Sequence, residues 1–428
     1  MHNVENILFK GGMVYDSTLR EFKASDLLIE NDIIQKIGQI QALGTNLEVI
    51  DVSGKIITPG LIDMHVHLRE PGREDEETII SGCQSAMAGG FTAVCCMPNT
   101  NPALHHRSQI EFVKNRAKDL LVDVFPIGAV TKDRAGKELT EMGDMLDAGA
   151  VAFSDDGETV ETAEMMRYAL EYSKMFSVTI IDHCEDQSLV RDKVMNESKI
   201  STLLGLPSAP TVAEDIIVAR DIMLAEFTGG HVHIAHISSG KSVELVREAK
   251  KKGIQVTAEV CTHHFVLTDE AIRAFDSNLR VNPPIRTEKD VEKIIEGLKD
   301  GTIDAIVTDH APHSIEEKDV EFSAAAPGMI GLETSVGLVM KFLVTEGHLS
   351  LVDIVEKMAI NPRRILKLPV PEIKEGEKAN ISILDQNLEW KVDKSTFKSN
   401  SRNTPFDNWT LIGKAFGVYN HGIWCCEM

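Results

Sequence analysis

Short apolar runs alternate with amphipathic stretches through the middle of the chain. Eight runs have the length and the flanking turn residues of buried strands, and they cover residues 60–67, 93–99, 123–130, 150–157, 178–185, 231–238, 254–264 and 305–313. Between them, apolar residues recur at helical spacing over 78–88, 162–173, 212–226, 242–252 and 289–298. This alternation predicts an α/β fold, a parallel (β/α)8 barrel of the TIM type over residues 59–366.

The two ends of the chain have a different pattern. Residues 7–15, 24–30, 33–40 and 48–57 are short β-rich segments separated by turns, and no helix of ordinary length fits among them. The same pattern returns over 379–384 and 411–426. We therefore expect residues 1–58 and 367–428 to pair into one small composite β domain, sandwich-like, formed by both chain ends.

Composition limits the classes of partner. The 428 residues include 44 Lys and Arg against 66 Asp and Glu, a formal charge of −22, and such a field repels nucleic acid and anionic membrane surfaces. The seven cysteines show no zinc-ribbon spacing, and no run reaches about 18 apolar residues. A cytoplasmic protein is expected. If its substrate is a small anion, the site must supply local positive charge.

Metal-ligand residue types gather at the carboxyl ends of the predicted strands, where TIM barrels place their chemistry. His65 and His67 are two residues apart, so on a strand they share a face. His183, His236 and Asp309 end three further runs. An isolated pair of this kind is often structural, but four histidines and an aspartate at four strand ends favour a centre for zinc or a similar ion.

Three segments are more specific. They are the run from Asp63 through His65, His67 and Arg69 to Gly72 (D-x-H-x-H-L-R-E-P-G), Met97–Thr100 (M-P-N-T) and Thr308–His313 (T-D-H-A-P-H). In this order they closely resemble the signatures of the dihydroorotase family, of the bacterial stand-alone type, within the amidohydrolase superfamily. The resemblance covers essentially the whole chain. It implies reversible cyclisation of N-carbamoyl-L-aspartate to L-dihydroorotate and water in pyrimidine (UMP) biosynthesis, with a metal-bridged hydroxide as nucleophile for ring opening.

The resemblance also implies a binuclear zinc site. His65, His67 and Asp309 would hold one Zn²⁺, and His183 and His236 the second. Many superfamily members bridge the ions with a carboxylated lysine, but residues 138–173 contain no lysine. The resemblance instead gives the bridge to the second aspartate of the F-x-D-D-G segment, Asp156, with Asp155 as the alternative, and makes Asp309 the general acid and base. Four other histidines are left out. His263 and His264 are not needed because the metal positions are filled, and His231 and His233 begin their strand, away from the mouth of the barrel.

Substrate-binding roles follow from the same resemblance. They fall to His67, Arg69, Asn99, Asn282, His313, Pro327 and Gly328. Arg69 offers a planar fork for a carboxylate, although a surface ion pair with Glu70 or Glu74 is the alternative.

Three rival functions and two associations stay open. The rival activities are those of allantoinase and dihydropyrimidinase, and a rival of another class is a non-catalytic partner of aspartate transcarbamoylase. A homodimer and an association of the active enzyme with aspartate transcarbamoylase are further expectations.

Overall fold

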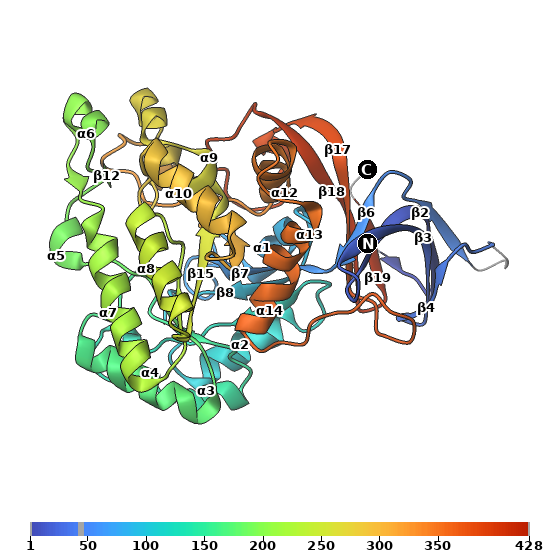
Figure 1. Ribbon diagram of the computed structural model, residues 1–428, viewed down its shortest axis with the longest axis horizontal. Helices are drawn as coiled ribbons and strands as arrows, with labels where there is room; N and C mark the ends of the chain where they lie inside the picture. The colour runs from blue at the N-terminus through green and yellow to red at the C-terminus, as the bar shows by residue number, and fades with distance from the viewer. Residues whose placement is uncertain (1, 42–46, 427–428) are drawn as a thin grey trace.

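The computed structural model describes residues 2–41 and 47–426, which form a barrel surrounded by helices and a β domain beside it (Figure 1). The barrel strands are β7 (Leu61–Val66), β8 (Phe91–Cys96), β9 (Asp123–Pro126), β10 (Phe153–Ser154), β11 (Ile180–Asp182), β14 (Val232–Ile234), β15 (Val256–Cys261) and β16 (Ala305–Val307). All pair in parallel with their neighbours. Parallel bridges Gly128–Phe153 and Val66–His310 close the ring. The predicted (β/α)8 barrel is therefore confirmed.

Helices follow the strands and cover the outside of the barrel. The longer ones are α1 (Ile79–Ala88), α2 (Arg107–Ala117), α4 (Ala163–Phe176), α7 (Val212–Thr228), α8 (Gly240–Lys251) and α10 (Glu288–Lys299). The shorter ones are α3 (Met142–Asp147), α5 (Gln187–Val190), α6 (Lys199–Leu204), α9 (Thr262–Val266), α11 (Ile315–Lys318), α12 (Ser335–Val339), α13 (Leu351–Val355) and α14 (Asn361–Ile365). The run 254–264 is thus only partly a strand, because it continues into α9. In the part of the chain that the structure describes, no helix is both long and apolar enough to span a bilayer.

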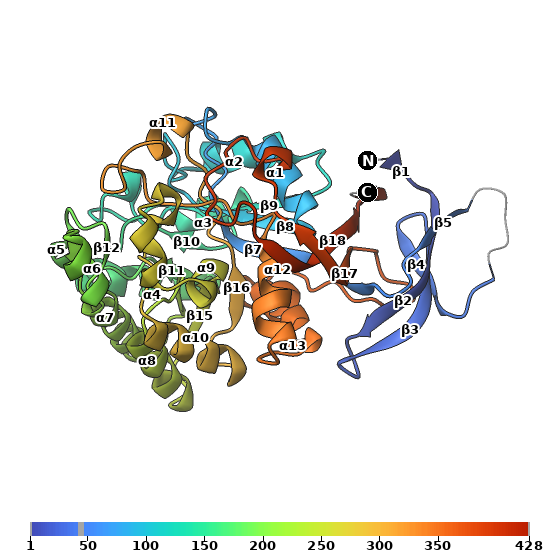
Figure 2. The ribbon, with the colours of Figure 1, turned by 90° about the horizontal axis from the view of Figure 1, so that it is seen from above.

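Strands from both chain ends form one sheet of nine strands. They are β1 (His2–Asn3), β2 (Asn6–Asp16), β3 (Glu21–Glu30), β4 (Ile33–Gly38), β5 (Glu48–Asp51), β6 (Ile56–Pro59), β17 (Ile381–Lys391), β18 (Thr410–Asn420) and β19 (Ile423–Cys426). β17 lies between β6 and β18, and β1 pairs with β19, so the two ends interleave. Figure 2 shows β17 and β18 between the barrel and the strands β2 to β4. The composite β domain is confirmed, whereas its limits at residues 58 and 367 stay a prediction. A separate pair, β12 (Met195–Asn196) and β13 (Ser208–Ala209), lies outside both sheets.

The segment between β17 and β18 leaves the β domain and returns to the barrel. Ser401 Oγ donates to the Glu76 carbonyl (2.8 Å), and Asn403 Nδ2 donates to the Ala311 carbonyl (2.9 Å). These contacts support the loops that follow β7 and β16. The C-terminal part of the chain therefore helps to shape the barrel mouth.

Candidate metal and substrate site

The six residues expected to hold metal lie together at the carboxyl ends of the strands. They are His65, His67, Asp156, His183, His236 and Asp309, and none is more than 7% exposed. His67 Nε2 is 2.9 Å from Asp309 Oδ1, and His65 Nε2 is 3.3 Å from Asp156 Oδ1. His183 Nδ1 is 2.9 Å from His236 Nε2, which is 3.7 Å from Asp156 Oδ1. Asp156 thus lies between two groups of donors.

The spacing of the donor atoms fits metal ions. A tetrahedral ion with bonds of about 2.0–2.1 Å separates its ligand atoms by about 3.3 Å. In the first group, four separations among His65, His67, Asp156 and Asp309 lie between 2.9 and 3.6 Å. His65 Nε2 and Asp156 Oδ1 are also buried without a hydrogen-bond partner. Buried polar atoms are rarely left unpaired, and imidazole with carboxylate suits zinc or a similar cation.

The two adjacent aspartates have different surroundings. Asp155 accepts hydrogen bonds from the backbone N–H (3.0 Å) and the hydroxyl (2.5 Å) of Thr131, so its carboxylate holds a neighbouring loop. Asp156 faces the histidines instead. Burial raises the pKa of Asp155 to about 6. Burial acts in the same direction on Asp156, but His65 and His236 hold its pKa well below the ordinary range.

The protonation of the cluster reflects an excess of negative charge. Burial opposes a charged His65, yet Asp156 and Glu259 raise its pKa well above the ordinary value. His183 behaves in the same way, because Glu185 and Asp156 outweigh burial and raise its pKa to about 9. The raised pKa values mean that protons on His65 and His183 offset part of this negative charge, whereas burial lowers the pKa of His67. A metal ion would replace these protons, since ligand nitrogens must be deprotonated.

Three buried residues to which the sequence patterns assigned no role orient His65. Glu259 Oε1 is 2.5 Å from His65 Nδ1, which leaves Nε2 directed at the donor group, and His233 Nε2 is 3.2 Å from Glu259 Oε2. Asp63 accepts hydrogen bonds from the backbone N–H groups of His65 and Thr308, both at 3.0 Å. Such partners hold a metal-binding imidazole in position. The sequence signal that could have found Glu259 is its place inside the apolar strand β15, because a buried carboxylate is costly in free energy unless it is paired.

Arg69 reaches the barrel mouth from a loop. β7 ends at Val66, and Arg69 has a φ of 58°, so Arg69 does not continue the strand. Arg69 Nε contacts the Pro312 carbonyl and Glu76 Oε2, each at 3.0 Å, and Nη2 is 3.3 Å from His313 Nε2. Because Nε already contacts these two groups, a ligand would bind the terminal edge of the guanidinium, which carries Nη1 and Nη2. Arg69 and His313 therefore lie side by side, as a carboxylate site requires.

Glu76, a further residue that the sequence did not indicate, joins these cations. It is 2% exposed, and its Oε1 is 3.1 Å from His313 Nδ1 and 3.0 Å from Arg73 Nη2. The alternative partners of Arg69 are engaged elsewhere: Glu70 pairs with Arg116 at 2.8 Å, and Glu74 accepts from the Gly72 N–H at 2.9 Å. The alternative for Arg69, a surface ion pair with Glu70 or Glu74, is therefore wrong, because Arg69 pairs with the buried Glu76.

The two asparagines contact the donor groups. Asn99 Oδ1 is 2.8 Å from His67 Nδ1, and its Nδ2 donates to Asp156 Oδ2 at 3.4 Å. Asn282 Nδ2 is 3.2 Å from His183 Nε2 and donates to Glu185 Oε2 at 3.1 Å. Both side chains therefore border the metal-ligand cluster as well as the space above it.

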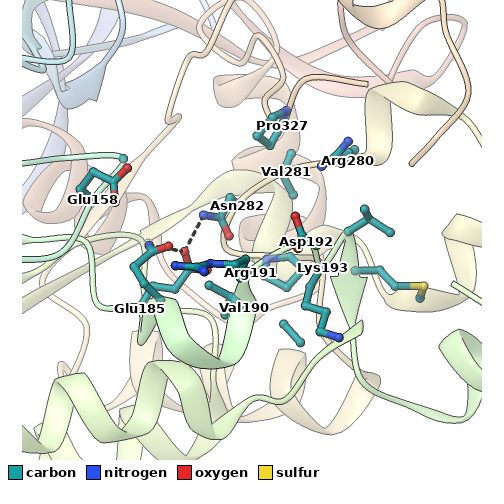
Figure 3. Close-up of a pocket in the computed structure, with 16 residues that line it drawn as sticks. Glu158, Glu185, Val190, Arg191, Asp192, Lys193, Arg280, Val281, Asn282 and Pro327 are labelled. Atoms are coloured by element: carbon teal, nitrogen blue, oxygen red, sulfur yellow. Dashed lines mark hydrogen bonds between the residues drawn. The ribbon is translucent and has the colours of Figure 1, made fainter. Parts of the chain in front are cut away.

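A cavity of 330 Å³ opens beside Glu185 and Asn282 (Figure 3), and both of these residues contact His183. Its lining includes Gly157, Glu185, Asn282 and Pro327. The Pro327 carbonyl is 3.0 Å from His313 Nε2, which connects this cavity with the Arg69 region. Gly328 has a φ of 149°, and a Cβ there would come within 2.9 Å of His313 Nε2, so only glycine fits without strain.

Comparison with known proteins agrees with this geometry. Residues 54–242 match the family model described as Dihydro-orotase-like. The chain is 48% identical over 417 residues to a dihydroorotase of Acetivibrio thermocellus, an alignment that covers 97% of this chain and 98% of that protein. It is 51% identical over 408 residues to a dihydroorotase of Pelotomaculum thermopropionicum, with 95% of each chain covered.

Solved structures share the fold at lower identity. The L-hydantoinase (dihydropyrimidinase) of Arthrobacter aurescens superposes with a TM-score of 0.87 at 24% identity, covering 100% of this chain and 96% of that one. A D-hydantoinase has a TM-score of 0.84 at 21% identity, with coverage of 99% and 95%. These structures support the barrel with its β domain. The family is shown by the two relatives, which are 48% and 51% identical over nearly the whole chain: this protein belongs to the dihydroorotase family.

Proposed function

We propose that this protein is a dihydroorotase, which interconverts N-carbamoyl-L-aspartate and L-dihydroorotate in pyrimidine biosynthesis. The observation that carries the proposal is the buried set of four histidines and two aspartates at the barrel mouth, with Arg69 and His313 beside it. The set occurs in a chain that is 48% identical to a named dihydroorotase over nearly its full length. The enzyme is therefore a cyclic amide hydrolase.

We infer that two Zn²⁺ ions complete the site. His65, His67 and Asp309 would hold one ion, His183 and His236 the other, and Asp156 both. This division follows the donor atoms, since Asp156 Oδ1 is 3.3 Å from His65 Nε2 and 3.7 Å from His236 Nε2. When bound, such ions activate water near neutral pH and polarise a carbonyl oxygen.

The proton transfers fall to Asp309. Its carboxylate is within hydrogen-bond distance of His67. Burial raises the pKa of Asp309, but His67 and His65 outweigh burial and lower that pKa below its ordinary value. An ionised carboxylate can accept a proton from the attacking water and deliver it to the departing amide nitrogen of the ring, which is general acid and base catalysis. In the direction of ring closure the same carboxylate acts in the reverse order.

The substrate carboxylate requires positive charge in an acidic protein. Arg69 would supply a bidentate fork, with the His313 ring beside it in the same site, while Glu76 holds both in place. Asn99 and His67 would line the same side. Asn282 and the backbone at Pro327 and Gly328 would contact the ring from the opposite wall, next to the 330 Å³ cavity.

Allantoinase and dihydropyrimidinase are the rival activities. The hydantoinase structures resemble this chain in fold at 24% identity or less. No lysine lies between residues 138 and 173 to serve as the carboxylated-lysine bridge that the resemblance gives to many superfamily members. Turnover of dihydroorotate, dihydrouracil and allantoin by the purified protein tests the proposal. We expect dihydroorotate to be hydrolysed fastest. Faster turnover of either other substrate would refute the proposal.

Metal analysis addresses the non-catalytic alternative. Every expected ligand position is filled, so we propose two bound ions per chain, and fewer than one ion would favour a structural partner of aspartate transcarbamoylase. We propose in addition a cytoplasmic enzyme that forms a homodimer and associates with aspartate transcarbamoylase. Size-exclusion chromatography with light scattering, alone and with that enzyme, tests both associations.

A further inference from the structure

A buried lysine lies behind the substrate pocket. Lys318 ends α11 and is 5% exposed. Among the described residues, no carboxylate lies within ion-pair distance of its ammonium group. Isolated ammonium groups are costly to bury, so the contacts that it does make need an explanation.

The ammonium group bonds three backbone carbonyls. Lys318 Nζ donates to the carbonyls of Ala326 (2.8 Å), Gly328 (3.0 Å) and Arg280 (3.4 Å). A protonated lysine has three N–H donors, so each donor has one acceptor. Two of the acceptors flank Pro327, and the third lies two residues before Asn282.

These carbonyls belong to two segments that border the proposed substrate. Figure 3 shows Arg280, Val281 and Pro327 beside one another on one wall of the cavity. The Gly328 N–H also donates to the Arg280 carbonyl at 2.8 Å. The segments are therefore joined to each other directly and through a single ammonium group.

The charge at this position carries a cost. Burial lowers the pKa of Lys318 to about 7; Arg280 acts in the same direction, and Asp276 opposes it. A methionine of similar length would avoid this cost, yet it could not bond the carbonyls. We therefore attribute the presence of a lysine at position 318 to its hydrogen bonds with the backbone carbonyls, and not to the space that the side chain fills.

We propose that Lys318 is a positioning residue of the substrate pocket, which holds the segments 280–282 and 326–328 in register. It sets the place of the Asn282 side chain and of the backbone around Pro327 without touching the metal ligands. The inference rests on the proposed position of the substrate against these segments. Its loss should weaken substrate binding more than it slows the chemical step.

The test compares two buried lysines. Lys357 is also 5% exposed and donates to a carbonyl, that of Ile303 at 2.6 Å, and its pKa is also lowered by burial. Ile303 precedes β16, so Lys357 lies at the end of the barrel opposite the mouth. We expect Lys318→Met to raise the KM for dihydroorotate about tenfold or more, with kcat within about twofold of wild type. Lys357→Met should lower Tm and leave KM unchanged.

Further variants make the outcome decisive. Lys318→Gln keeps two N–H donors, so its KM should fall between those of wild type and Lys318→Met; it also serves if the methionine variant does not fold. A wild-type KM in the Lys318 variants, or an equal rise in Lys357→Met, would overturn the inference. Asn282→Ala separates the two proposals. An unchanged KM in this variant refutes the substrate position, whereas a raised KM beside unaffected Lys318 variants refutes only the role of Lys318.

Discussion

Replacing Arg69 with methionine tests whether the site is built for an anionic substrate. The change keeps an unbranched side chain of similar reach and removes the guanidinium. Arg69 is 13% exposed and its terminal edge lies next to His313, so a substrate carboxylate there would be only weakly screened by solvent. Removing one partner of such a pair costs about 2–5 kcal/mol. That cost corresponds to a loss in kcat/KM of about 30-fold to about 5,000-fold.

Part of the effect will appear as lost stability, since Arg69 also neutralises Glu76. The Glu76 carboxylate keeps Arg73 and His313 as partners, so we expect a destabilisation of only about 1–3 kcal/mol. Urea denaturation measures this contribution separately. Arg116→Met is the matched control, because Arg116 pairs with the buried Glu70 at 2.8 Å outside the site. It should change stability and leave kcat/KM near the wild-type value.

The decisive assay compares dihydroorotate with dihydrouracil, which lacks the carboxylate. Activity of the Arg69→Met protein on dihydrouracil should be close to that of wild type, however low, whereas activity on dihydroorotate should fall steeply. Metal content should be unchanged because a guanidinium does not bind cations. Equal losses on both substrates, or loss of metal, would refute the reasoning and leave Arg69 as a support for the loop.

Three further predictions concern the metal ligands and one buried lysine. His65→Ala and His183→Ala should each lower metal content measured by mass spectrometry and abolish activity, because no neighbouring side chain can replace the lost nitrogen; wild-type stoichiometry in both would exclude these residues from the site. Asp156→Ala should reduce the content of both ions, while Asp155→Ala, which loses the bonds to Thr131, should mainly destabilise the fold, and the reverse result would make Asp155 the bridge. Burial lowers the pKa of Lys318 to about 7 from an ordinary 10.5, so between these pH values the unfolded chain binds a proton that the folded chain does not. Raising the pH removes this advantage of the unfolded chain, and the stability of wild type relative to Lys318→Met should therefore rise from about pH 7 to about pH 10. A constant difference in urea denaturation across this range would contradict that pKa.

The barrel and the gathering of histidines and aspartates at its mouth could be predicted because both depend on local patterns. Alternating strand and helix periods indicate parallel β/α units, and the carboxyl ends of parallel strands meet at one face of the barrel. His65 and His67 share a strand face by simple alternation. Their convergence with His183, His236 and Asp309 follows from the same rule, whatever the details of packing.

Tertiary structure alone decided which partner each of these groups has. Glu259 is 194 positions from His65, and Asn403 is 92 positions from Ala311, yet each pair is within hydrogen-bond distance. No local period encodes such contacts, because they depend on the stagger of the strands around the barrel and on the path of long loops.

Tertiary packing also decides the different roles of Asp155 and Asp156, and it places the buried Glu76 next to Arg69. β10 has only two residues, so alternation along the strand cannot decide which aspartate turns inward; the packing of Thr131 against Asp155 does. The sequence by itself determined the types of ligand and the end of the barrel where they meet. The packed structure determined their orientation and their charge, because burial and contact with distant residues set both.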